Sequence, residues 1–278
     1  MSEIIKAIIF GIVEGITEWL PISSTGHMII LDEFIRLNCS EEFMEMFLVV
    51  IQLGAIFAVV LLFWDKIFPF QFRNKRKPVI EKDKMMLWGK IIVACIPAAV
   101  VGLLFDDIFE ALFYHAVPVA IALIVFGIAF IVIEREHAGK QPEIPYLEDI
   151  DFKTALLIGL FQLIAAIFPG TSRSGATIVG ALLVGVSRTA ASEFTFCLAI
   201  PVMFGASLLK ILKFGFVFTD MEAAVLLIGM AAAFIVSVFV IRFLMDYIKK
   251  HDFQAFGWYR IILGLIVLLL NICGIIQV

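Results

Sequence analysis

The residues best suited to chemistry lie in one short stretch near the start of the chain. Glu14 and Glu18 are four residues apart, so in a helix both carboxylates project from one face. Such a pair can hold a divalent cation or tune a neighbouring base. His27 follows shortly after, where an imidazole can act as base or acid for a nearby hydroxyl. The alternative is a carboxylate pair at a water interface beside a structural histidine.

Between the carboxylates and His27 lies a hydroxyl-rich break. Pro21 suits the end of a helix, and Gly26 lets the backbone turn sharply. The hydroxyls of this break belong to Ser23, Ser24 and Thr25. These hydroxyls can react with a ligand or bind it, or they can simply cap the next helix. Beside two carboxylates and a histidine, we interpret them as part of a site, with Ser24 as the candidate nucleophile.

A second break, from Pro169 to Thr177, offers donors in place of acids. Its polar residues are Thr171, Ser172, Arg173, Ser174 and Thr177, which follow the Pro169-Gly170 pair. Hydroxyls, backbone N–H groups at a helix start and a guanidinium fork suit a phosphate or diphosphate. Arg173 can also pair with Glu14 or Glu18, and the two roles are compatible. The second break therefore predicts an anion-binding site.

The two breaks are related by an offset, because Pro169 lies 148 residues after Pro21. This alignment also places Gly11 on Gly159, Ser24 on Ser172 and Gly26 on Ser174. The positions matching Glu14, Glu18 and His27 are Gln162, Ala166 and Gly175. Acid and base groups therefore belong to one break and anion binding to the other. Phosphoryl transfer needs that division, whereas a symmetric transport pathway does not.

Composition sets the surroundings of both breaks. Of the 278 residues, 62% are hydrophobic and 17% charged, and the mean hydropathy is +1.07. Soluble domains are about 25% charged, so we expect an all-α polytopic membrane protein. A net charge of −4, with basic residues gathered in loops and not along one face, does not indicate nucleic-acid binding. The four cysteines form no metal-binding pattern, so we interpret them as small core residues. The N-terminus does not predict a cleaved signal peptide.

Apolar segments long enough to span a membrane follow each break. They lie at about 43–64, 88–105, 116–133, 190–212, 221–243 and 257–274. We predict one integral membrane domain of two repeats, residues 1–134 and 150–278. Each repeat has a re-entrant helix hairpin, at about 5–36 and 153–187, and three spans. If each hairpin enters and leaves on the same side, each half crosses the membrane three times, so the second half starts from the opposite side. The repeats then have the inverted topology of many transporters.

Basic residues predict the orientation of this arrangement. Of the 21 Lys and Arg residues, sixteen fall on one side, Arg173 lies within the second break, and the other side receives only Lys6, Arg36, Lys210 and Lys213. The positive-inside rule assigns the first side to the cytoplasm. Both termini and the first hairpin then face outward, and the second hairpin enters from inside.

The run EGITEWLPISSTGH from Glu14 to His27 and the run PGTSRSGAT from Pro169 to Thr177 carry a family resemblance. They resemble the two signature motifs of the undecaprenyl-diphosphate phosphatases of the bacitracin-resistance type. Similarity at Gln52-Leu-Gly-Ala and Gly257-Trp-Tyr-Arg260 supports it, and length, motif order and hydropathy agree over the whole chain.

The resemblance implies hydrolysis of undecaprenyl diphosphate to undecaprenyl phosphate and inorganic phosphate, which recycles the lipid carrier of cell-wall synthesis. It also implies a divalent cation such as Mg or Ca, an outward-facing site in a bacterial plasma membrane, and bacitracin resistance, because bacitracin sequesters the substrate. The residues tied to catalysis are Glu14, Glu18, Ser24, His27 and Arg173. The diphosphate-contacting hydroxyls are Ser23, Thr25, Ser172, Ser174 and Thr177.

Our mechanistic hypothesis is that Ser24 attacks the terminal phosphorus while His27 assists proton transfer. Glu14 and Glu18 orient a metal ion or the base. Arg173 and the backbone from Gly170 through Thr171 to Ser174 hold the transferred group. Direct attack by water is the alternative, with Ser24 only a ligand. A monomer and a homodimer are both compatible with the chain.

Three other readings compete with this one. A secondary transporter or polyprenyl-phosphate flippase would use the same inverted-repeat site. Membrane lipid phosphatases of the acid-phosphatase superfamily carry a histidine soon after their Ser-Arg pair, but here none follows before His251. A purely structural membrane protein would carry polar residues at membrane depth without a use for them.

Overall fold

The described part of the molecule is built from helices. The structure is a computed structural model that describes residues 1–71 and 79–276. Its helices are α1 (Glu3–Thr17), α2 (Ser24–Phe34), α3 (Glu41–Leu62), α4 (Trp64–Ile67), α5 (Lys82–Phe113), α6 (Ala116–Glu136), a 3-10 turn η1 (Leu147–Asp149), α7 (Phe152–Ile167), α8 (Arg173–Leu183), α9 (Arg188–Phe214), α10 (Asp220–Tyr247) and α11 (Gln254–Ile272). Within those residues, extended pairing is limited to isolated bridges. The all-α class is confirmed.

The predicted spans are confirmed as long apolar helices. Among the described residues, six helices are long and apolar enough to cross a membrane, and they are α3, α5, α6, α9, α10 and α11. The protein is therefore a multi-pass membrane protein. Polar caps set several starts: Ser40 accepts from the backbone N–H of Phe43, and Thr219 forms a capping box with Glu222.

The two hairpins are pairs of helices too short to cross alone, since a span needs about 20 residues. Helices α1 and α2 are joined by residues 18–23, and α7 and α8 by residues 168–172. Asp151 caps α7 by accepting from the backbone N–H of Thr154, and this hydrogen bond lowers the pKa of the Asp151 carboxyl. That the hairpins are re-entrant stays a prediction.

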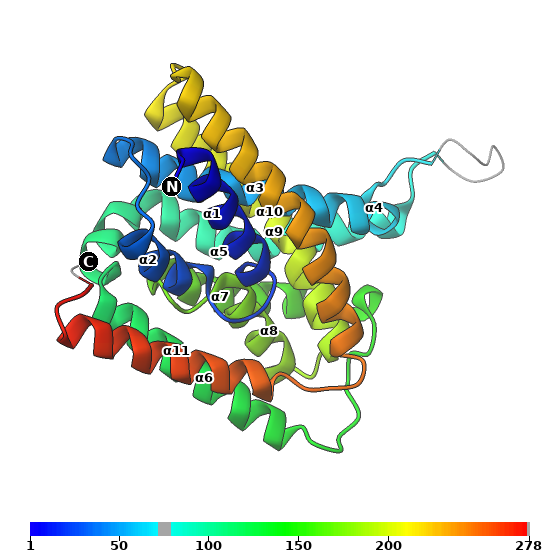
Figure 1. Ribbon diagram of the computed structural model, residues 1–278. Coiled ribbons are helices and arrows are strands. Elements are labelled where there is room, and N and C mark those ends of the chain that lie inside the picture. Colours follow the sequence, from blue (N-terminus) through cyan, green and yellow to red (C-terminus); the bar gives the residue numbers. More distant parts are fainter. Residues whose placement is uncertain (72–78, 277–278) are drawn as a thin grey trace.

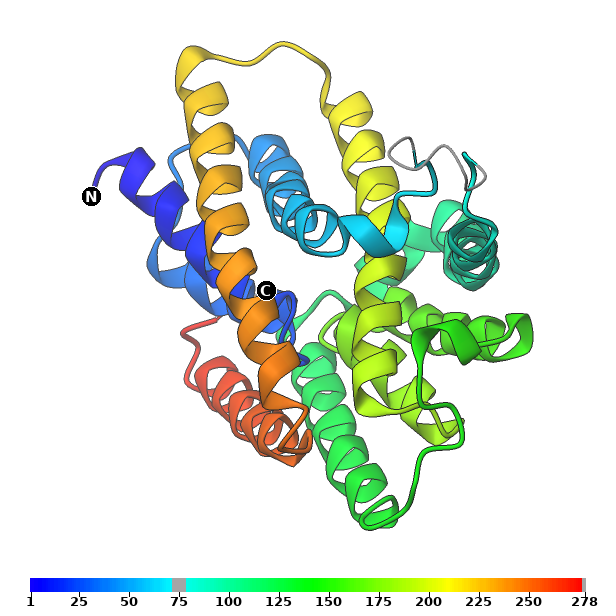
Figure 2. The ribbon, with the colours of Figure 1, turned by 90° about the vertical axis from the view of Figure 1, so that its right-hand side faces the viewer.

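Each hairpin packs against a long helix from the other half of the chain. Helix α1 packs on α10, α7 packs on α5, and α6 and α11 lie side by side (Figures 1 and 2). The contacts are backbone-close: a Cβ on Gly11 would lie 2.3 Å from the Gly229 carbonyl oxygen, and a Cβ on Gly159 would lie 2.3 Å from the Ala94 carbonyl oxygen. These are the aligned glycines. This reciprocal pattern is consistent with a repeat, and its inverted orientation stays a prediction.

The backbone at the two breaks corrects the sequence alignment by one residue. Ser23 and Ser172 are the N-caps of α2 and α8, at φ 74° and 69°, and they are the described non-glycine residues with positive φ. Their hydroxyls accept from the backbone N–H of Gly26 and Gly175 respectively. Ser23 therefore matches Ser172, and Ser24 matches Arg173. The expected match of Ser24 with Ser172 was wrong because the second break has one more residue between its proline and its capping serine, Gly170 and Thr171 where the first break has only Ile22.

The cysteines follow the prediction only in part. Cys197 is fully buried in the central core, and Cys39 and Cys95 are half-buried. Cys273 is exposed near the end of α11, so its assignment to the core was wrong. It comes at the very end of the last apolar helix, where the chain leaves the packed interior.

Candidate active site

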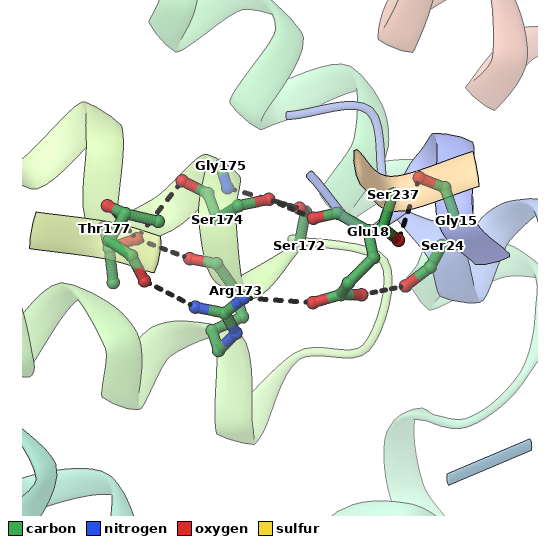
Figure 3. A network of polar contacts seen from close by, with 10 residues as sticks. Gly15, Glu18, Ser24, Ser172, Arg173, Ser174, Gly175, Thr177 and Ser237 are labelled. Atoms are coloured by element: carbon green, nitrogen blue, oxygen red, sulfur yellow. Dashed lines mark hydrogen bonds and ion pairs between the residues drawn. The ribbon is translucent and has the colours of Figure 1, made fainter. Parts of the chain in front are cut away.

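The two breaks meet at the carboxylate of Glu18. Ser24 Oγ donates to Glu18 Oε2 at 2.8 Å, and Arg173 Nη2 donates to Glu18 Oε1 at 3.1 Å (Figure 3). Ser24 begins α2 and Arg173 begins α8, so one carboxylate joins two helix starts from opposite halves of the chain. A single diphosphate could touch both side chains, as a composite site requires.

Arg173 is held in place by a second set of contacts behind it. Its Nη1 donates to the Thr195 carbonyl oxygen at 3.1 Å. The Thr195 hydroxyl donates to Thr177 Oγ1 at 2.9 Å, and Thr177 Oγ1 donates to the Arg173 carbonyl oxygen at 2.9 Å. Thr177 and Thr195 are fully buried. In this arrangement Thr177, predicted to contact the diphosphate, supports Arg173 from behind.

The serines of the second break tie it to the first. Ser174 Oγ donates to the Glu18 carbonyl oxygen at 3.1 Å, and Ser172 Oγ lies 3.1 Å from Ser174 Oγ (Figure 3). Ser174 is buried, and Thr171 beside it is buried with no hydrogen-bond partner for its hydroxyl. The break is therefore a fixed part of the wall around Glu18 and Arg173. Thr25 lies half-buried next to Ser24 in the first turn of α2.

Glu14 lies one helical turn before Glu18 on the buried face of α1, as its spacing predicts. Only 1% of its surface is exposed, and its Oε1 has no hydrogen-bond partner. Gln162, the matching residue of α7, is likewise buried with both amide atoms unpartnered. Both helices thus carry a buried polar group without a hydrogen-bond partner in the last two turns before their break.

Among the described hydrogen bonds, none joins His27 to Ser24, although a Ser–His pair was expected. Its Nδ1 lies 2.7 Å from the Ser23 carbonyl oxygen, and its Nε2 lies 2.7 Å from the Tyr259 hydroxyl. A carbonyl oxygen can only accept, so Nδ1 carries the proton and Nε2 of the neutral ring accepts from Tyr259. The two rings also stack, with centroids 5.6 Å apart. The hydroxyl of Ser24 has Glu18 as its partner instead.

Sequence reasoning missed two neighbours of the site on α11. Tyr259 holds His27, and the fully buried Arg260 donates to backbone carbonyls of both breaks. Their signal was the run Gly257-Trp-Tyr-Arg260, which supported the family resemblance but suggested no role. A buried arginine in an apolar helix is itself a sign of a functional or structural site.

Comparison with known proteins places the chain in a family. The family described as bacitracin resistance protein BacA matches residues 7–266. The chain belongs to the BacA family. It is 68% identical over 269 residues to an undecaprenyl-diphosphatase of Desulfitobacterium hafniense, covering 97% of this chain and 96% of the relative. An undecaprenyl-diphosphatase of Enterococcus faecalis is 63% identical over 269 residues, covering 97% of each protein.

The acidic residues of this BacA-family site fit a divalent cation that a ligand helps to hold. Glu14 Oε1 is buried without a partner, and Glu18 lies on the same face of α1. Carboxylate oxygens are the donors that Mg²⁺ and Ca²⁺ prefer. Over residues 1–71 and 79–276, no group of three or more His, Cys, Asp or Glu side chains could hold a metal ion. The chain thus offers Glu14 and Glu18, and further oxygens would come from a phosphate ligand.

Proposed function

We propose that this protein hydrolyses undecaprenyl diphosphate to undecaprenyl phosphate and inorganic phosphate, as the names of its relatives say of those proteins. The carrying observation is that one carboxylate, Glu18, binds both a hydroxyl and a guanidinium. A nucleophile, a base and an anion-binding group are the parts that phosphoryl transfer needs. Undecaprenyl phosphate is the carrier lipid of the cell wall, so this reaction would return it to use and confer bacitracin resistance.

Ser24 is the nucleophile in our mechanism, and Glu18 is its base. As Ser24 Oγ forms a bond to the terminal phosphorus, its proton passes to Glu18 Oε2, its hydrogen-bond partner. The bond from that phosphorus to the bridging oxygen breaks, and undecaprenyl phosphate leaves. Water then hydrolyses the phosphoserine and releases inorganic phosphate. Glu18 replaces His27 as the group that receives the serine proton, because His27 is bonded to Ser23 and Tyr259.

Arg173 changes partner when the substrate arrives. Without substrate, its charge and that of Glu18 neutralise each other across 3.1 Å in a largely buried site. A diphosphate offers Arg173 more negative charge and a bidentate geometry. Transfer of the guanidinium to the phosphate would release Glu18 to accept the proton of Ser24. Substrate binding would thereby activate the nucleophile.

A divalent cation, Mg²⁺ or Ca²⁺, is part of the proposal. Glu14 and Glu18 would hold it, and when bound it would neutralise charge on the diphosphate. We also propose that the site faces the outer, periplasmic side of a bacterial plasma membrane, where membrane lipids deliver the substrate and bacitracin competes for it. The basic residues of the opposite side support this orientation. A homodimer is compatible with these proposals.

Phosphate release tests the function. Purified protein in detergent is given undecaprenyl diphosphate and a divalent cation, and inorganic phosphate is measured. We expect release by the wild type and a loss of about 1,000-fold or more in Ser24→Ala, because the nucleophile is removed. Rapid quenching of wild type with labelled substrate should trap phosphoserine. Release of phosphate without phosphoserine would favour direct attack by water. No release of phosphate, together with movement of the lipid across vesicles that contain the protein, would favour a flippase.

Tyr259 gives a second, smaller prediction. Tyr259→Phe removes the hydroxyl that donates to His27 Nε2 and keeps the stacking ring. We expect kcat to fall about five- to tenfold, the worth of one hydrogen bond. The ¹⁵N resonances of His27 should shift as Nε2 loses its donor. Tyr247→Phe is the matched control, because Tyr247 stacks on His251, and it should change neither kcat nor the spectrum of His27. An unchanged His27 spectrum in Tyr259→Phe contradicts the pairing.

A further inference from the structure

Arg260 of α11 is bonded to the backbone of both breaks. Its Nη1 donates to the Pro21 carbonyl oxygen at 3.2 Å. Its Nη2 donates to the carbonyl oxygens of Gly170 at 3.1 Å and Thr171 at 2.7 Å. Pro21 lies three residues before Ser24, and Thr171 lies two before Arg173. One planar side chain thus connects the two segments that carry the nucleophile and the anion-binding group.

The charge of Arg260 is compensated in an unusual way. Its side chain is fully buried, yet no carboxylate among the described residues lies within ion-pair distance of it. Carbonyl dipoles surround it instead, and Phe126 places a ring 5.8 Å from the guanidinium carbon. By contrast, Arg188 pairs with the buried Glu134. Burying a guanidinium against carbonyls is costly, so it indicates a function for those contacts.

We propose that Arg260 is a positioning residue that sets the distance between the two breaks, and hence between Ser24 and Arg173. Contacts from two nitrogens to carbonyl oxygens of both breaks use the rigid fork of a guanidinium, which lysine cannot imitate with a single nitrogen. The contacts are to backbone atoms, so they fix the path of the chain. We call the contacts of Arg260 with the carbonyl oxygens of Pro21, Gly170 and Thr171 the clamp. Without the clamp, Ser24 and Arg173 are both present but are no longer held at the right distance from each other.

Gly175 provides an independent way to disturb the clamp. A Cβ on Gly175 would lie 2.8 Å from Arg260 Nη1. Gly175→Ala therefore pushes the guanidinium from its carbonyls while the charge of Arg260 stays in place. Gly205→Ala is the matched control, because nothing lies within 4 Å of a Cβ at that position.

A distance measurement tests the clamp without any assay of activity. Spin labels are attached to cysteines at the exposed positions Ile16 and Phe168, in a chain whose own cysteines are replaced by alanine. We expect one narrow distance distribution in the otherwise unaltered protein, and a broader or shifted one in Arg260→Lys, Arg260→Met and Gly175→Ala. Gly205→Ala and Arg188→Lys should retain the narrow distribution. An unchanged distribution in the Arg260 and Gly175 variants overturns the proposal.

Kinetics gives the second readout, and only this part rests on the proposed function. With undecaprenyl diphosphate, we expect kcat to fall about 100-fold in Arg260→Lys and Gly175→Ala, the cost of misplaced reacting groups. KM should change by less than about threefold. If Arg260→Lys keeps full activity while Arg260→Met loses it, charge alone matters and the clamp is refuted. Should Arg260→Met fail to fold, Gly175→Ala and Arg260→Lys decide.

Discussion

Replacing Glu18 with glutamine should lower kcat by about 1,000-fold, because it removes the group that receives the Ser24 proton. The amide keeps the shape of the side chain and can still accept from Ser24, so the fold should persist. The substitution also deprives Arg173 of its ion-pair partner. Phosphate release and burst-phase phosphoserine, measured under saturating undecaprenyl diphosphate, report the effect.

Two comparisons make the Glu18 result specific. Glu193→Gln disturbs another glutamate in an ion pair, with Lys66 at 2.7 Å, and should leave kcat unchanged. His27→Gln should be less damaging than Glu18→Gln, because both ring nitrogens of His27 are hydrogen-bonded to groups other than the Ser24 hydroxyl. If His27→Gln abolishes phosphoserine formation while Glu18→Gln does not, the histidine is the base, and the assignment of Glu18 is wrong.

Replacing Arg173 with lysine should lower kcat/KM by about 100- to 1,000-fold although the charge is kept. A lysine has no fork with which to hold the Thr195 carbonyl oxygen and a phosphoryl oxygen together. The variant needs measurement of both kcat and KM, since we expect weaker binding as well as slower transfer.

The double variant of Glu18 and Arg173 tests whether the two residues act as a unit. Because they form one ion pair, Glu18→Gln combined with Arg173→Lys should cost much less than the product of the single effects. Arg242→Lys, on the exposed side of α10, is the control and should behave as wild type. Strictly multiplicative losses would show that the pair is not coupled, against the proposed exchange of partners.

The sequence was sufficient for the spans and for the residues around Glu18. Apolar runs of span length predicted α3, α5, α6, α9, α10 and α11, because a bilayer leaves few alternatives to a helix. The spacing of Glu14 and Glu18 placed both on the buried face of α1. Pro21 and Pro169 marked where the two hairpins break.

The remaining contacts depend on side chains far apart in sequence. His27 and Tyr259 are separated by 232 positions, and nothing in the local pattern of either residue indicates the other. The reach of Arg260 to Pro21 and Thr171 requires the crossing of α11 over both breaks. The one-residue slip between Ser24 and Ser172 arose because turn length, which short motifs do not reveal, decides which residue caps a helix.

The crosswise packing of the hairpins bears on how the protein is made. Helix α1 is synthesised first but rests on α10, and Arg260 of α11 reaches back to the first break. A chain that is still being synthesised already contains Glu18 and Ser24, but it lacks helices α10 and α11, which contact the first hairpin. The contacts that hold the first break are therefore complete only once the last two helices, α10 and α11, are in place.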